Sequence, residues 1–84
     1  MKKCTIVVDM QNDFVAGALG FPNAQTIVTR IKAMLQQMDQ TQDLIFTLDT
    51  HDLDYLTTQE GRNLPVEHCI KGTWGHEIVK ELHP

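Results

Sequence analysis

The sequence predicts an α/β fold with a parallel sheet, of which the chain holds an incomplete βαβ-plus-helix portion. Two β-branched apolar segments, residues 4–9 and 43–49, flank an amphipathic segment between them. A strand, a helix and a strand in this order form a βαβ unit, whose strands run parallel through a right-handed crossover. Parallel sheets are normally covered on both faces. With two strands and about two helices, the chain should leave a sheet edge and an apolar face open unless a second copy or a complementing chain covers them.

The first expected strand covers residues 4–9 and reads CTIVVD. Its nearly continuous apolar character is typical of a parallel strand buried on both faces, which places Cys4 in the core. A polar run at residues 9–13 ends the strand, and a glycine-containing loop at 14–22 follows it.

The expected helix begins after Asn23, a residue type that commonly caps helices. The apolar positions behind it have the spacing of an amphipathic helix and are Ile27, Val28, Ile31, Met34, Leu35 and Met38. Residues 43–49 are expected to form the second strand. Residues 50–71 are polar and irregular, and loops longer than about 12–15 residues are usually functional or disordered. A last helix is expected over 73–82, with an apolar face that includes Val79.

The composition restricts the possible classes of function. Among 84 residues, 7 are Lys or Arg and 11 are Asp or Glu, which gives a net charge of −4. Binding of nucleic acid or of an anionic membrane needs clustered basic residues, so neither is expected. No apolar run approaches the roughly 20 residues that span a bilayer, and no signal-peptide cleavage site follows the basic start. We therefore expect a single cytoplasmic domain with Cys4 and Cys69 as reduced thiols.

Two carboxylates end the two expected strands. Asp9 and Asp49 should meet at one edge of a parallel sheet, and open α/β sheets bind ligands beyond that edge. The alternative is that each Asp only ends its strand. Phe14 follows the polar run and either reaches a pocket or packs under the loop.

The loop after the second strand contains possible metal ligands. Asp49 and His51 point to the same side of an extended segment, and Glu60 and His68 supply further oxygen and nitrogen donors. Two imidazoles with one or two carboxylates suit zinc, manganese or iron. Alternatively, these are ordinary polar loop residues. Cys69 is expected on the face opposite to His68, as a buried structural thiol.

Residues 6–14 read IVVDMQNDF, and this segment resembles the opening motif of the isochorismatase-like cysteine hydrolases, which include the nicotinamidases. The similarity continues in the same order through residues 17–19, then 47–51 (TLDTH), and finally 64–75 (LPVEHCIKGTWG). Together these segments extend over essentially the whole chain.

The resemblance implies a three-layer α/β/α domain with a mostly parallel sheet. It also implies hydrolysis of a small amide, nicotinamide to nicotinate and ammonia in the nicotinamidase branch, by a cysteine nucleophile with an Asp base and an assisting Lys. Asp9 matches the Asp and Phe14 a substrate-pocket aromatic. The metal-ligand positions implied by the resemblance are Asp49, His51, Glu60 and His68. Glu60 stands where most members of the family have a second His in this loop. Zinc is the expected metal, with manganese or iron as alternatives.

The chain departs from the family in length. The catalytic Lys and the nucleophilic Cys of the family lie farther along than residue 84, and Lys71 and Cys69 belong to the motif around His68. Residues 1–84 are therefore expected to be the amino-terminal part of one hydrolase domain, inactive alone. Two alternatives remain: a metal-free cysteine hydrolase of the same family, and an inactive truncated or split metal-binding subunit.

Overall fold

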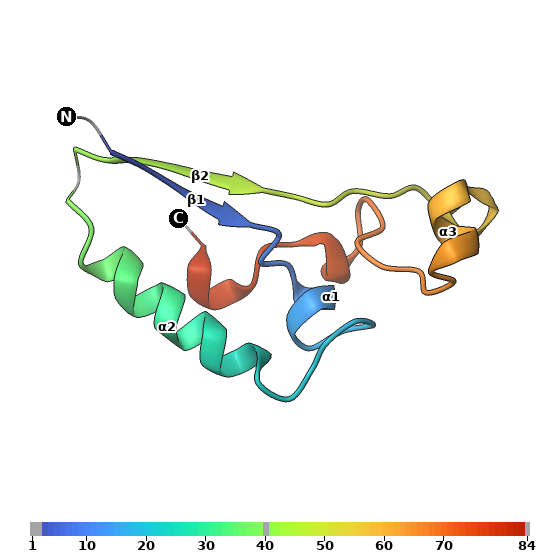
Figure 1. Ribbon diagram of the computed structural model, residues 1–84, viewed down its shortest axis with the longest axis horizontal. Helices are drawn as coiled ribbons and strands as arrows, with labels where there is room; N and C mark the ends of the chain where they lie inside the picture. The colour runs from blue at the N-terminus through green and yellow to red at the C-terminus, as the bar shows by residue number, and fades with distance from the viewer. Residues whose placement is uncertain (1–2, 40, 84) are drawn as a thin grey trace.

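The predicted βαβ unit is present in the computed structural model, which describes residues 3–39 and 41–83. β1 (Cys4–Val8) and β2 (Asp43–Thr47) pair in parallel, and α2 (Ala24–Gln36) connects them. Figure 1 shows α2 on one side of the strand pair, with the carboxy-terminal segment in red between the strands and the helices. The described residues thus form one sheet and one helical layer of an α/β fold.

The two faces of the sheet differ sharply in exposure. Val7 faces α2 and is 5% exposed, whereas Ile6 and Val8 on the opposite face are 56% and 63% exposed. Ile45 pairs with Ile6 and is also exposed. The expectation of a first strand buried on both faces is therefore wrong, and Cys4 is exposed rather than in the core. The reason is that no element within residues 3–39 and 41–83 covers this face.

The core lies between the sheet, α2 and the carboxy-terminal segment. Its buried side chains are Val7, Val15, Ala24, Val28, Val79 and Leu82. Full burial of one such aliphatic side chain stabilises by only about 1.5–3 kcal/mol, so this core is thin. Ile31 and Leu35 of the predicted stripe pack against it, but Ile27 and Met34 are exposed. Asn23 occupies the predicted N-cap position without a side-chain capping bond.

The helix predicted over 73–82 is wrong. The structure has two short 3₁₀ helices there, Trp74–His76 and Lys80–Leu82. The main chain between them bonds to the amino-terminal run: the Asn12 amide donates to the Glu77 carbonyl at 2.9 Å, and the Val79 amide donates to the Met10 carbonyl at 3.0 Å. Pairing with a distant segment therefore replaces local helical bonds.

The polar segment 50–71 is ordered. It contains a 3₁₀ helix, Tyr55–Thr57, and α3 (Gln59–Asn63), which lies at the far end of the molecule's long axis (Figure 1). The Thr58 hydroxyl caps α3 by accepting a hydrogen bond from the Gly61 amide at 3.0 Å. Another short helix, α1 (Asn12–Val15), follows the polar run after β1.

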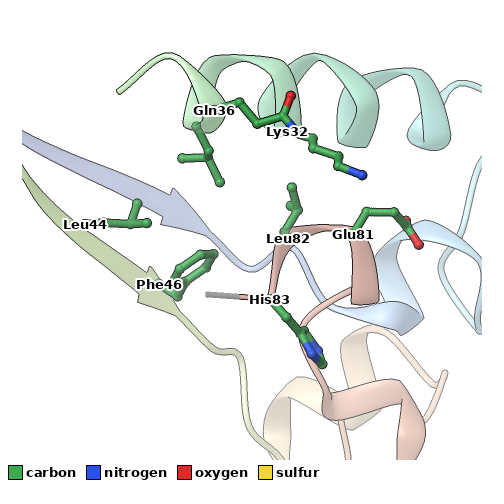
Figure 2. A pocket seen from close by; sticks show the side chains of 8 residues that line it. Lys32, Gln36, Leu44, Phe46, Glu81, Leu82 and His83 are labelled. Carbon is green, nitrogen blue, oxygen red and sulfur yellow. The ribbon is translucent and has the colours of Figure 1, made fainter. Parts of the chain in front are cut away.

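A groove of about 290 Å³ opens beside β2 on the side of the sheet that faces α2. Figure 2 shows Leu44 and Phe46 of β2 pointing into it from the strand, opposite Leu82 and Lys32. None of the predicted site residues lines this groove. No helix in the described part of the chain is long and apolar enough to cross a membrane.

Candidate functional site

Three of the predicted metal ligands lie together. Asp49 Oδ2 is 3.0 Å from His51 Nε2 and 3.2 Å from His68 Nε2. Asp49 and His51 follow β2 directly, whereas His68 comes from the loop after α3. The three ligand atoms all lie within 4.8 Å of one another. The loop at 50–71 thus returns to the edge of the sheet at which it began.

The donor set and its spacing fit a first-row divalent ion. One carboxylate oxygen and two imidazole nitrogens are ordinary ligands of zinc, manganese and iron. A tetrahedral ion with bonds near 2.1 Å separates its ligand atoms by about 3.4 Å. The two measured separations from Asp49 Oδ2 are close to that value.

The second ring nitrogen of each histidine also has a partner. His68 Nδ1 lies 2.7 Å from the Val66 carbonyl oxygen, which can only accept, so the neutral ring has its proton on Nδ1 and its lone pair on Nε2. This is the tautomer that a metal ligand needs. His51 Nδ1 lies 3.7 Å from Glu60 Oε2. Glu60, with 59% of its side chain exposed, therefore lies beside His51 and outside the three-residue cluster.

The Tyr55 ring packs against the rings of both histidines. It is fully buried, and its ring centroid lies 4.6 Å from that of His51 and 5.1 Å from that of His68. Its hydroxyl donates to the Leu64 carbonyl at 2.8 Å. Burial, with smaller contributions from the charges of Glu60 and Asp49, raises the pKa of Tyr55. The sequence marks Tyr55 only as an aromatic in a polar loop, so its position was not predictable.

Asp9 leaves β1 in a left-handed conformation, with a φ of 54° that is rare for a residue with a side chain. Thr47 at the end of β2 holds it there. The Asp9 amide donates to the Thr47 carbonyl and hydroxyl oxygens, and the Thr47 hydroxyl donates to Asp9 Oδ1 at 2.7 Å. Strained residues of this kind persist where the surroundings hold them and cluster at functional sites.

Phe14 contacts both the hollow at Asp9 and the histidine cluster. Together with Asp9 and Phe21 it lines a hollow of about 220 Å³ at the end of β1. Its ring centroid is 5.6 Å from that of His68, with an edge-to-face orientation. Phe14 therefore reaches a hollow and also contacts one of the three clustered residues.

Cys69 is fully buried next to His68. Burial, reinforced by the charges of Asp49, Asp13 and Asp9, raises the pKa of its thiol to about 12. A thiol is nucleophilic only as the thiolate, which is essentially absent at neutral pH with such a pKa. This agrees with the expectation of a structural cysteine.

The polar run after β1 has a role that residue patterns alone did not reveal. Gln11 is fully buried and Asn12 nearly so, and the Gln11 side chain bonds to the main chain of Asp49. The Asp13 carboxylate accepts from the Cys69 amide at 2.7 Å. The only signal in the sequence was their place in the motif at residues 6–14.

Comparison with known proteins agrees with these observations. The isochorismatase domain family matches residues 3–84. This chain belongs to the isochorismatase domain family. A nicotinamidase of Saccharomyces cerevisiae is 30% identical over 108 residues, an alignment that includes 95% of this chain and 50% of the yeast protein. The resemblance identified from the motifs is thereby confirmed.

Solved structures of the family have the same fold. Pyrazinamidase of Pyrococcus horikoshii, determined in complex with zinc, is 30% identical with a TM-score of 0.77, over 94% of this chain and 45% of that one. N-carbamoylsarcosine amidase from Thermoplasma acidophilum is 27% identical with a TM-score of 0.79, over 100% and 47%. The α/β fold class is confirmed, and the chain spans about half the length of these relatives.

Proposed function

We propose that this chain is the amino-terminal part of a nicotinamidase-like amidohydrolase, which converts nicotinamide to nicotinate and ammonia. The observation that supports the proposal is the cluster of Asp49, His51 and His68. The Phe14 ring contacts His68 of this cluster and also lines the hollow at Asp9. Hydrolases of the family at about 30% identity support the reaction class.

Asp9 is the general base in this proposal. Its carboxylate borders the hollow, and the hydrogen bond from the Thr47 hydroxyl fixes one of its oxygens. The other oxygen is then oriented to accept a thiol proton from a nucleophilic cysteine, which an acyl-enzyme mechanism requires. That cysteine and an assisting lysine would come from the second half of the domain, because Cys69 is buried and protonated.

Asp49, His51 and His68 would hold a divalent metal, zinc in preference to manganese or iron. Glu60, 3.7 Å from His51 Nδ1, would either be a fourth ligand or orient that ring. When bound, the metal would serve as a Lewis acid for the pyridine nitrogen of the substrate. The Phe14 ring, between the hollow and His68, would pack against the substrate ring and orient its amide toward Asp9.

We further propose that the exposed sheet face packs against the second half of an isochorismatase-type domain, whichever polypeptide carries it. The face is formed by Ile6, Val8 and Ile45. Parallel sheets survive by burial on both faces, and the relatives are about twice as long as this chain. The relatives therefore have the additional chain that such a cover requires. We propose the cytoplasm as the location, on the basis of the two free thiols.

One observation favours a second candidate. N-carbamoylsarcosine amidase has a TM-score as high as that of the zinc-bound pyrazinamidase. A metal-free cysteine hydrolase of the family with a different amide substrate is therefore the main rival, and an inactive metal-binding subunit is the other.

The metal and the reaction are tested separately. The purified chain should contain stoichiometric zinc, manganese or iron by elemental analysis and lose it in His51→Ala. Co-expression with the carboxy-terminal half of the Saccharomyces cerevisiae nicotinamidase should give a complex that releases ammonia from nicotinamide, and Asp9→Asn should abolish this release. A complex without bound metal that hydrolyses N-carbamoylsarcosine but not nicotinamide would establish the rival.

The chain alone should release no ammonia. Turnover that survives Cys69→Ala would contradict the need for a second half. Turnover that Cys69→Ala abolishes would instead identify Cys69 as the nucleophile.

A further inference from the structure

We propose that Gln11 and Asp13 are positioning residues, which set the distance between the two loops that carry Asp49, His51 and His68. Neither residue is expected to contact the metal. The inference rests on the metal site of the proposed function, and it assigns a task to the polar run after β1 that the reaction itself does not require.

The Gln11 side chain forms hydrogen bonds with both the amide and the carbonyl of Asp49. Its Nε2 donates to the Asp49 carbonyl at 2.9 Å, and its Oε1 accepts from the Asp49 amide at 2.8 Å. The same Nε2 donates to the His76 carbonyl at 2.7 Å. The two bonds to Asp49 fix the peptide planes before and after it, and thereby the direction in which its side chain leaves the backbone. Because Gln11 is fully buried, water cannot substitute for these bonds.

Asp13 acts on the other loop. Its Oδ2 accepts from the Cys69 amide at 2.7 Å, and its Oδ1 accepts from the Ala18 amide at 3.3 Å. Cys69 has a φ of 50°, an unfavourable conformation for a residue with a side chain, and it directly follows His68. A charge-assisted hydrogen bond to its amide stabilises this conformation and so places His68.

The two loops are also bonded to each other. The His51 amide donates to the Cys69 carbonyl at 3.0 Å, and the Lys71 amide donates to the His51 carbonyl at 2.8 Å. Gln11 and Asp13 are two residues apart at the start of α1. One short segment therefore bonds to both of the loops that carry the metal ligands. Loss of either anchor would let the ligand atoms separate while the fold persists.

Partners that orient metal ligands typically contribute 10–100-fold to metal affinity, which gives the expected size of the effect. Gln11→Met keeps the length of the side chain and removes all three hydrogen bonds. Asp13→Asn removes the charge at nearly constant shape. Asn12→Leu is the matched control, because the Asn12 side chain is buried and donates at 2.7 Å to the Trp74 carbonyl rather than to a residue of either ligand loop.

The experiment measures the zinc dissociation constant by competition with a chromophoric chelator, and the absorption spectrum of the cobalt-loaded chain. Urea unfolding of each metal-free variant measures stability. We expect Gln11→Met and Asp13→Asn to weaken zinc binding about 10–100-fold and to alter the cobalt spectrum. Asn12→Leu should lower the unfolding midpoint but change zinc affinity by less than about twofold. If Gln11→Met does not fold, Gln11→Glu replaces it, since it loses both donors but keeps the acceptor.

Unchanged zinc affinity in the Gln11 and Asp13 variants, with zinc bound to the unaltered chain, would overturn this inference alone. Equal weakening in Asn12→Leu would overturn it too, because general loosening would then explain the effect. Failure of the unaltered chain to bind zinc, manganese or iron would overturn both this inference and the proposed metal site.

Discussion

His68 Nε2 lies 3.2 Å from Asp49 Oδ2, although the two residues belong to different loops. In the neutral ring, the Val66 carbonyl, 2.7 Å from His68 Nδ1, favours the tautomer whose Nε2 lone pair faces the carboxylate. Two negative or lone-pair-bearing groups at this distance repel each other unless a proton or a cation lies between them. The arrangement is therefore one that a divalent cation would stabilise.

Removal of one clustered imidazole should abolish metal binding. We expect His68→Ala to weaken zinc binding more than about 100-fold, since ligand loss should exceed the effect of an outer partner. Isothermal titration with zinc measures this. His83→Ala is the control, because His83 is exposed and bonds to the Ile78 carbonyl. The zinc affinity of this variant should equal that of the unaltered chain. A loss of affinity in His83→Ala similar to that in His68→Ala would contradict the assigned cluster.

Glu60 should contribute less than His68. Its carboxylate is largely exposed and reaches only to 3.7 Å from His51 Nδ1. Glu60→Gln should weaken zinc binding about tenfold, whether Glu60 binds the ion or orients His51. Zinc titration at constant ionic strength measures it, with Glu67→Gln as an exposed control in the same loop. An affinity equal to that of the unaltered chain would remove Glu60 from the site.

Cys69 should make stability depend on pH in the alkaline range. Its pKa is about 12 in the folded chain against 9.0 for an unperturbed thiol, so the folded state keeps the proton longer. The stabilisation is therefore complete below pH 9 and declines as the pH rises from 9 toward 12. Urea unfolding at several alkaline pH values should show a steeper decline in the unaltered chain than in Cys69→Ala. Parallel curves would contradict the raised pKa.

The two thiols should also differ in chemical reactivity. Cys4 is exposed, so an alkylating reagent should modify it at pH 8, whereas the buried Cys69 should react only after urea unfolding. Mass spectrometry after proteolysis distinguishes the two sites. Alkylation of Cys69 in the folded chain at pH 8 would show that its thiol is accessible.

The sequence predicted local features well and long-range bonds poorly. β1, β2 and α2 follow from patterns of apolar residues within each segment, and the parallel pairing follows from their order. The helix expected over 73–82 failed because Glu77 and Val79 bond to the main chain of residues 10–12, a competition that no local pattern records.

The same distinction holds at the site. Asp49 and His51 share a side because they are two residues apart in an extended segment, which is a local rule. His68 was expected as a further nitrogen donor because the loop from residue 49 to residue 68 is long enough to wrap an ion, and the family resemblance then matched it to a ligand position. The role proposed for Gln11 depends on partners 38 and 65 residues away, and Tyr55 packs on two histidines from separate loops. Such contacts exist only once the chain has folded.

A glycine at residue 75 should be essential for the position of the Asp13 carboxylate. A Cβ atom at residue 75 would clash with the Asp13 carboxylate, whereas one at Gly72 would meet no other atom. Gly75→Ala should lower the free energy of unfolding by about 1–3 kcal/mol and weaken zinc binding. Gly72→Ala, the control, should cost about 1 kcal/mol for its left-handed φ of 85° and leave zinc affinity unchanged. Equal zinc affinities in the two variants would contradict the link between Asp13 and the ligand loops.

The open face of the sheet should be the contact surface for the second half of the domain. A lysine at Ile6 would place a charge at the centre of the apolar face, where burial without a partner is costly. Ile6→Lys should therefore abolish the one-to-one complex with the carboxy-terminal half of the yeast nicotinamidase, as measured by light scattering after co-expression. Leu53→Lys is the control, because Leu53 is 86% exposed in the polar loop, and it should leave the complex intact. A homodimer of this chain that Ile6→Lys dissociates would instead make a second copy the occupant, and a complex unaffected by Ile6→Lys would mean that the contact lies elsewhere.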